Sequence, residues 1–195
     1  MSMPESPAVL GQHLRQLRKE QKLSLAKLSE RSDVSVSMLS HIERGQTMPS
    51  LRSLNRICQA LNIEMSAIFP TSDPEYEDES SEVVRAHGRA ELAFKPYGLT
   101  KELLSPKRNK SLEFFMVTLE PGGGSGPELL VRQGEKAGMV VQGELSLLIG
   151  EKQYVLSEGD SFQFNSSKPH RILNNTDSPI KILWIIRPDS IVGDI

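Results

Sequence analysis

Two groups of side chains in this sequence have the chemistry to bind other molecules. Hydroxyl, imidazole and guanidinium groups gather between residues 35 and 52, and such groups donate hydrogen bonds to base edges and phosphates. A second, basic group in the C-terminal half includes Arg132, Lys136 and His170, which suit a carboxylate or another anionic group. The side-chain types therefore indicate nucleic-acid binding in one part of the chain and small-anion binding in another.

The distribution of charge favours the N-terminal part for nucleic acid. The whole chain has a formal net charge of -2, which by itself predicts no such partner. Residues 1–69, however, hold nine Lys or Arg against six Asp or Glu, whereas residues 70–82 hold six acids and no base. Only the first segment is net basic, so we expect any DNA contact there.

The elements that must position the first group are short helices. Leucines recur at helical spacing from Leu10, and Ser24, Ser35 and Ser50 each stand where an N-cap would start a further helix. A short fifth helix is expected over residues 64–69. Helices this short are unstable alone, so the pattern predicts five helices that share one core.

A change of pattern divides the chain into two domains. We place a helical domain at residues 1–70, an acidic linker at 71–82 and a second domain at 83–195. The linker has too few apolar side chains to bury. The second domain consists of short β-rich runs separated by Gly, Pro, Asn and Asp, which is typical of an antiparallel sandwich or barrel.

The cellular class follows from cysteine usage and hydropathy. Cys58 is the single cysteine, which excludes an intrachain disulfide and fits a reducing compartment. Its apolar neighbours favour a buried thiol over a redox switch. No apolar run approaches the roughly 18 residues of a membrane span. We therefore expect a soluble, cytoplasmic protein with no membrane partner.

The stretch from Leu23 to Ile63 resembles the helix-turn-helix domain of the XRE/Cro/C1 repressor family in both residue type and spacing. The resemblance implies a first helix over Ser24 to Arg31 and a recognition helix over Ser35 to Arg44, which would lie in the major groove. The family usually has Ala and Gly where this chain has Ser29 and Asp33. Serine still allows close helix packing, and Asp tolerates the left-handed conformation of the turn.

The same resemblance supplies a predicted DNA-binding surface. Val36, Ser37 and His41, with Ser40 beside them, are expected to face base edges, while residues around the next turn are expected to contact phosphates. The full set is Ser24, Ser35, Val36, Ser37, Ser40, His41, Arg44, Thr47, Ser50 and Arg52. The family also pairs an arginine with a glutamate, here Arg18 and Glu43, which we assign to structure. The alternative is a helical domain whose basic residues only solvate its surface.

Residues 83–195 resemble the cupin superfamily, whose fold is a double-stranded β-barrel related to the jelly roll. The glycines of the first cupin motif match Gly124 and Gly143, but its three metal-ligand positions hold Leu130, Arg132 and Lys136. The second motif keeps its histidine as His170. Since two of the replacing side chains are cationic, we expect neither a metal nor another cofactor.

The replaced positions instead predict an effector site. Leu130 and Arg132 lie two apart on a strand and so face the same side, and an inward arginine requires a partner. The predicted effector residues are Leu130, Arg132, Lys136, Met139, His170 and Trp184. A carboxylate-bearing effector is one partner for Arg132. The other is an internal carboxylate, Glu113 or Glu128.

Together these features predict a sequence-specific transcription regulator and not an enzyme. We expect a repressor of metabolic or transport genes that binds double-stranded operator DNA as a homodimer and responds to a small molecule in the cupin barrel. One alternative is an enzyme with metal-free acid–base chemistry at Arg132, Lys136 and His170. Another is a constitutive DNA-binding protein whose barrel only dimerises.

Overall fold

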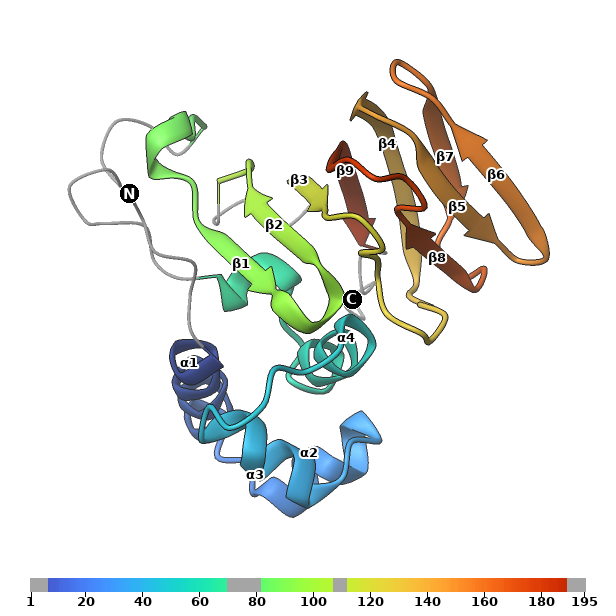
Figure 1. Ribbon diagram of the computed structural model, residues 1–195. Helices are drawn as coiled ribbons and strands as arrows, with labels where there is room; N and C mark the ends of the chain where they lie inside the picture. The colour runs from blue at the N-terminus through green and yellow to red at the C-terminus, as the bar shows by residue number, and fades with distance from the viewer. Residues whose placement is uncertain (1–6, 70–81, 107–111, 189–195) are drawn as a thin grey trace, which may run out of the picture.

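The computed structural model describes residues 7–69, 82–106 and 112–188. These residues form a helical region and a strand-rich region that lie against one another (Figure 1). Nearly all of the predicted linker, residues 71–82, lies outside the described residues, so the domain boundaries stay predictions.

The helical region contains four α-helices within the described ranges. Their bounds are α1 Pro7–Glu20, α2 Leu25–Ser32, α3 Val36–Glu43 and α4 Leu51–Ala60. The last three begin after Ser24, Ser35 and Ser50, whose hydroxyl oxygens each accept the backbone N–H three residues further on. These N-caps satisfy amide groups that have no partner inside the helix, as the sequence predicted.

The expected fifth helix, over residues 64–69, is a 3-10 helix and not an α-helix. It is η1, Met65–Ile68, and it is followed by Phe69 in an extended conformation. The amide of Ala67 donates to the carbonyl of Glu64 at 3.1 Å, a bond that spans three residues instead of four. The segment is too short to nucleate an α-helix by itself.

Two features position α3 relative to the other helices: the turn that follows α2 and an ion pair with α1. Asp33 ends α2 in the left-handed conformation, with φ 52° and ψ 35°, as expected where the family has glycine. The guanidinium of Arg18 on α1 makes two hydrogen bonds to the carboxylate of Glu43 at the end of α3, at 2.6 and 2.7 Å, and both side chains are buried. This geometry agrees with the structural role assigned to that pair.

The strand-rich region contains two antiparallel sheets. Their strands are β1 Glu91–Phe94, β2 Leu99–Leu103, β3 Glu113–Leu119, β4 Gly134–Gln142, β5 Leu145–Ile149, β6 Lys152–Leu156, β7 Ser161–Asn165, β8 His170–Leu173 and β9 Ile180–Pro188. Short 3-10 helices, η3 Ala86–Gly88 and η4 Lys95–Tyr97, flank β1. One sheet has the order β1-β2-β3-β9-β4-β7, and the other has the order β6-β5-β8. Closure of the two sheets into a barrel stays a prediction.

Alternation along the central strands places one set of side chains in the core. On β3 every second residue is buried, from Glu113 through Phe115 and Val117 to Leu119. The paired strand β9 alternates in the same way. Because successive side chains point to opposite faces, β3 and β9 together present a single apolar face to the inside.

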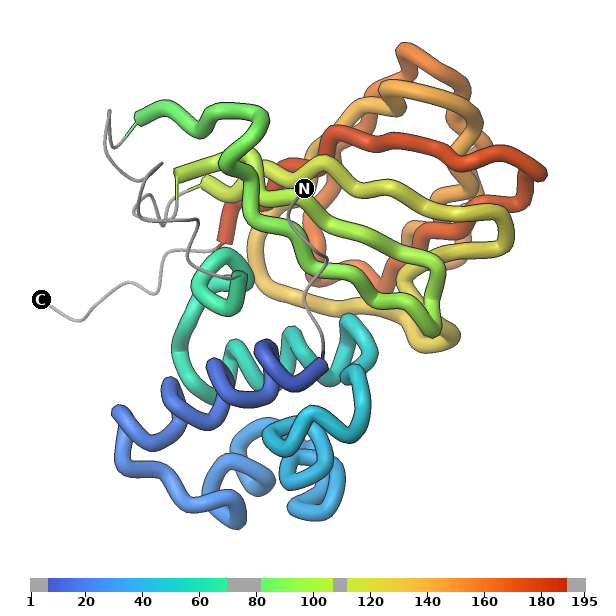
Figure 2. Tube along the Cα trace, turned by 60° about the vertical axis from the view of Figure 1, so that its left-hand side comes forward, coloured from blue at the N-terminus to red at the C-terminus, as the bar shows by residue number. Residues whose placement is uncertain are grey.

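The helical and strand-rich regions share contacts at η1 and α4. The rings of Phe69 and Phe115 lie 5.5 Å apart, and the amide of Ser66 donates to the Glu113 carboxylate at 2.6 Å. The trace shows the segment from α4 to η1 lying directly beneath the strands, between them and the remaining helices (Figure 2). The two regions therefore meet through a packed, hydrogen-bonded contact.

Candidate functional site

The predicted base-contacting residues lie together on the outer face of α3. Ser37 and His41 are exposed, and the side chain of Val36 is 44 % exposed. Leu39 and Ile42, which share the helix, are buried in the core of the helical region. Since α3 has only eight residues and is capped at both ends, its outer face is a short, rigid platform. Met38, 45 % exposed, also lies on this face and was not predicted.

The predicted phosphate-contacting residues surround the start of α4. Arg44 is exposed, while Thr47, Ser50 and Arg52 are half-buried. A groove of about 350 Å³ separates this surface from the loop at residues 125–128 of the strand-rich region. Arg52 lies 3.6 Å from the carboxylate of Glu128, and both side chains are partly exposed. Such a pair is weak in water, so it leaves Arg52 available for another anion.

A small cavity is lined by residues of the two sheets and of α4. Five of the six predicted effector residues line it: Leu130, Arg132, Lys136, His170 and Trp184. Further apolar walls come from strands β2, β3, β8 and β9, and α4 contributes Leu51 and Asn55. The volume of the cavity is about 20 Å³. The first and last lining residues, Leu51 and Ile186, are 135 positions apart in the sequence. The fold therefore brings distant residues together at this cavity.

Met139 is the predicted effector residue that the structure places elsewhere. It is 40 % exposed and is absent from the cavity lining. The reason is strand parity. Lys136 points inward on β4, and a residue three positions further along the same strand points to the opposite face. The prediction rested on the apolar character of Met139 and missed its position in the alternation.

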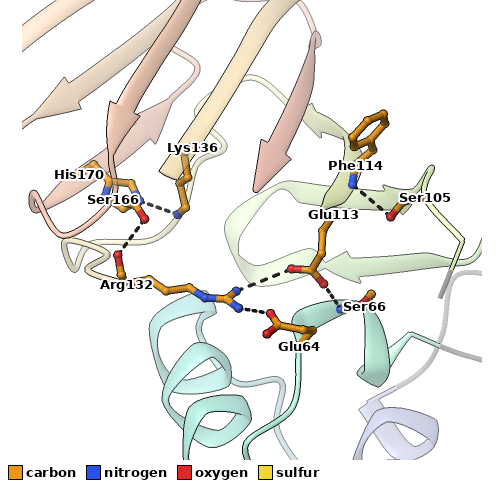
Figure 3. A network of polar contacts seen from close by, with 9 residues as sticks. All are labelled: Glu64, Ser66, Ser105, Glu113, Phe114, Arg132, Lys136, Ser166 and His170. Carbon is orange, nitrogen blue, oxygen red and sulfur yellow. Dashed lines mark hydrogen bonds and ion pairs between the residues drawn. The ribbon is translucent and has the colours of Figure 1, made fainter. Parts of the chain in front are cut away.

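Arg132 binds two carboxylates from different parts of the fold (Figure 3). Its guanidinium forms an ion pair with Glu64, which precedes η1, and lies 3.8 Å from Glu113 on β3. Glu113 is one of the two internal partners that the sequence suggested, whereas Glu128 pairs with Arg52 instead. Glu64 was not predicted, because nothing local in the sequence marks a contact across 68 positions.

Lys136 and His170 form a buried contact deeper in the cavity. The Lys136 Nζ lies 2.6 Å from the His170 Nε2, and the His170 Nδ1 lies 2.8 Å from the backbone carbonyl of Lys168. A carbonyl oxygen can only accept, so Nδ1 carries the proton and Nε2 accepts from the lysine. The histidine is therefore held in a single tautomer.

Burial governs the ionisation of this pair. Burial first, and like-charge repulsion from Lys136 second, lower the pKa of His170 to about 3. Burial also lowers the pKa of Lys136 well below 10.5, with Lys101 and Arg132 adding like-charge repulsion. Burial therefore disfavours the protonated form of both side chains.

Lys101 on β2 is a cavity residue that the sequence analysis missed. It is 7 % exposed, its Nζ lies 4.4 Å from the centre of the Phe115 ring, and burial lowers its pKa to about 8. The alternating pattern Leu99, Lys101, Leu103 was the available signal, since it places the lysine on the buried face of its strand.

Within the described ranges, no three His, Cys, Asp or Glu side chains lie close enough together to hold a metal ion.

Cys58 is buried, and burial raises the pKa of its thiol to about 12, which suits a core residue. In the same ranges, no helix combines the length and the apolar character needed to cross a membrane.

Two family models match this chain. A helix-turn-helix model matches residues 14–68, and a cupin domain model matches residues 115–186. The first range contains the capped helices α2 and α3, and the second contains Arg132, Lys136 and His170. The two matches therefore coincide with the two candidate sites.

Curated relatives cover the chain to different extents. The chain is 29 % identical over 174 residues to the HTH-type transcriptional regulator PuuR of Escherichia coli (strain K12), covering 89 % of this chain and 91 % of the relative. It is 36 % identical over 72 residues to the HTH-type transcriptional regulator SinR of Bacillus subtilis (strain 168), covering 36 % of this chain and 62 % of that one. The second likeness is confined to roughly a third of the chain.

A solved structure shares the whole arrangement. An HTH_3 family transcriptional regulator from Vibrio cholerae superimposes with a TM-score of 0.72 at 24 % identity, covering 93 % of this chain and 96 % of that chain. At this identity the likeness concerns the fold alone.

Proposed function

We propose that this chain, an HTH-type transcriptional regulator with a C-terminal cupin domain, binds operator DNA through α3. Its affinity for that DNA changes when a small carboxylate occupies the cupin cavity. The observation that carries the proposal is the cavity itself. It joins a buried arginine of the cupin domain to a glutamate and a helix of the DNA-binding domain. A ligand there meets both domains.

The DNA-binding half of the proposal rests on the exposed face of α3. Ser37 and His41 can donate to or accept from base edges, and Val36 suits the methyl group of thymine. Arg44 is exposed and Thr47 and Arg52 are half-buried, which supports the proposal that they contact phosphates. This DNA-contacting surface is small and supplies few contacts. We therefore propose a homodimer on an inverted repeat with half-sites about one helical turn apart.

Exposed apolar residues on the cupin domain support the homodimer. On the edge strand β6, Tyr154 is 43 % and Val155 is 60 % exposed, and Met139 and Val141 of β4 are 40 % and 39 % exposed. Edge strands with exposed apolar side chains readily pair with another chain. A Val155→Lys variant should shift the protein toward the monomer in sedimentation velocity, whereas Lys152→Glu on the same strand serves as the control.

The chemistry of the cavity favours an anionic effector. Arg132 and Lys101 bring two cations to it, and Lys136 becomes a third when it is protonated. Apolar side chains such as Leu130 and Trp184 form the remaining walls. A diamine would meet like charges at this position, so we propose an organic acid with a short apolar body.

Thermal-shift screening tests the effector class. We expect one or more organic acids to raise the Tm of the full-length protein, since a ligand that binds only the folded state stabilises it. Arg132→Met should remove the shift without weakening binding to operator DNA selected from random duplexes. Stabilisation by diamines alone, or an unchanged shift in the Arg132→Met protein, would contradict the carboxylate assignment.

The salt dependence of operator binding tests the DNA-binding half of the proposal. Each phosphate contact releases counterions, so the operator affinity should fall steeply as salt is raised from about 50 to 200 mM. A flat dependence is incompatible with phosphate contacts from this surface.

We expect repression of metabolic or transport genes in the cytoplasm, which a reporter gene under the selected operator would reveal.

The contact between Lys136 and His170 favours a second candidate function, metal-free acid–base catalysis. An amine and an imidazole whose nitrogens lie 2.6 Å apart can exchange a proton with a bound substrate. Reproducible turnover by the purified protein would support that function, and ligand-dependent stabilisation without turnover supports the regulator. A constitutive DNA-binding protein, the third reading, predicts no ligand of either kind.

A further inference from the structure

The DNA-binding domain forms one wall of the cupin cavity. Leu51 and Asn55 belong to α4, and both line the cavity together with residues of the sheets. They are four positions apart, so they lie on one face of the helix, and Leu51 is 4 % exposed. Helix α4 thus forms one side of the cavity, and the strands together with the loop that carries Ser125, Leu130 and Arg132 form the others.

A ligand larger than the cavity can bind there only if one wall of the cavity moves. Its volume is about 20 Å³, and a single water needs roughly 10–15 Å³ of such space. A carboxylate that carries even two or three carbon atoms is several times larger. The strand walls are held by backbone ladders between β3, β9 and β4, and the loop that carries Leu130 and Arg132 is joined to residues 166 and 170 by backbone hydrogen bonds. Among the described residues, α4 makes no backbone hydrogen bond to these walls. The wall that yields is therefore α4.

The two carboxylates on Arg132 differ in how easily they can leave. Glu113 is fully buried and also accepts the backbone N–H of Ser66 at 2.6 Å. The side chain of Glu64 is 25 % exposed, and Glu64 lies at the domain boundary ahead of η1 (Figure 3). Glu64 can turn into water with little cost in solvation, while Glu113 cannot.

An exchange at this position would keep the charges of the site balanced. Arg132 and Lys101 face Glu64 and Glu113, two cations against two carboxylates. An incoming carboxylate that replaces Glu64 leaves that balance unchanged. A diamine would instead add positive charge beside Arg132 and Lys101.

Building on the effector function proposed above, we infer that the cavity is a carboxylate site shared by the two domains. The effector's carboxylate takes the place of Glu64 on Arg132, and its apolar body displaces Leu51 and Asn55. Glu64 and α4 then separate from the cupin domain together. Because Ser50 and Arg52 at the start of α4 belong to the predicted phosphate-contacting surface, occupancy of the cavity repositions that surface.

Trp184 makes the inference measurable without a known operator. It is the single tryptophan of the 195-residue chain, it is 4 % exposed, and it lines the cavity. We would titrate the full-length protein with sodium propanoate, replacing sodium chloride so that ionic strength stays constant, and follow the fluorescence of Trp184. In parallel, hydrogen–deuterium exchange would be compared between residues 51–60 and strand β5.

The expected result is a saturable change in Trp184 fluorescence, together with faster exchange in residues 51–60 and unchanged exchange in β5. Glu64→Gln should bind propanoate about tenfold more tightly, the equivalent of about 1.4 kcal/mol, because the competing carboxylate is gone. It should also exchange faster over residues 51–60 without any ligand. Glu128→Gln removes the other carboxylate at this boundary and should leave propanoate affinity unchanged.

Each remaining outcome separates this inference from the function it rests on. If propanoate titrates Trp184 and Arg132→Met abolishes the titration, but Glu64→Gln binds no more tightly and α4 exchange does not change, the cavity binds the effector and the shared-site inference is overturned. If propanoate has no effect on wild type or Glu64→Gln, or 1,3-diaminopropane titrates Trp184 instead, the carboxylate class itself is overturned.

Discussion

Gly11 of α1 lies directly against the backbone carbonyl of Ile42 in α3. A Cβ atom placed on Gly11 would be 2.1 Å from that oxygen, far inside contact distance. The opposing atom is backbone, so no side-chain rotation can relieve the clash. The close approach of α1 and α3 thus depends on the absence of a side chain at this position.

Gly11→Ala should therefore destabilise the helical domain, although alanine is the better helix former. Overpacking of this kind typically costs about 1–3 kcal/mol, and the displaced helix is α3. We expect a lower midpoint of urea unfolding and weaker operator binding. Gln12→Ala, at the neighbouring exposed position of α1, should change neither. A Gly11→Ala protein as stable as wild type would show that α1 and α3 pack more loosely than described.

The buried pair of Arg18 and Glu43 gives a second prediction. Removing one partner leaves an uncompensated buried charge, which costs about 3–5 kcal/mol where burial is complete. Arg18→Met should accordingly lower the free energy of unfolding by about 3 kcal/mol. The exposed pair of Lys27 and Glu30 on α2 is the control. Lys27→Met should have little effect in the same urea titration, since water screens that pair.

The stability of the protein should decrease in mild acid because of His170. Its pKa of about 3, lowered from 6.5 mainly by burial, means that the unfolded chain binds a proton that the folded protein does not. Stability is therefore lost as the pH falls below 6.5, at up to about 1.4 kcal/mol per pH unit, and this loss continues toward pH 3. Stability contributed by this group is fully present above pH 6.5.

Urea unfolding at a series of pH values measures that loss. Between pH 6.5 and 5 the wild-type protein should lose about 2 kcal/mol through this one group. His170→Gln, which keeps an acceptor for Lys136, should show a flatter profile over the same window. His41→Gln on the exposed face of α3 should keep the wild-type profile. Equal slopes in all three proteins would mean that His170 does not stay neutral in the fold.

The surface of α3 gives a fourth prediction, on sequence specificity. His41→Ala and Ser37→Ala should each weaken operator binding by about 1–3 kcal/mol and leave non-specific binding almost unchanged. Arg44→Gln should weaken both and make the salt dependence less steep. The exposed Gln59 on α4, replaced by alanine, controls for changes elsewhere in the domain. Fluorescence anisotropy with selected and scrambled duplexes makes the comparison.

The sequence by itself determined the elements whose signals are local. Ser24, Ser35 and Ser50 mark their helix starts because a cap bond spans only three residues. Asp33 adopts the left-handed conformation that the turn between α2 and α3 requires. Motif spacing was also sufficient to group Leu130, Arg132, Lys136 and His170 around one cavity. The strand expected at Leu130 and Arg132 was wrong, because both lie in the loop between β3 and β4, and the apolar type of Met139 was mistaken for an inward position.

Only the tertiary structure decided what Arg132 binds and which element closes the cavity. Leu51 and Asn55 line the cavity from the helical domain, and Glu64 pairs with Arg132 from the same domain, through contacts that no local periodicity encodes. The lowered pKa values of Lys136 and His170 likewise come mainly from burial by segments distant in the sequence. The sequence gives the type of each side chain. Desolvation and ion pairing, however, depend on neighbours in space, and these neighbours come together only when the chain folds.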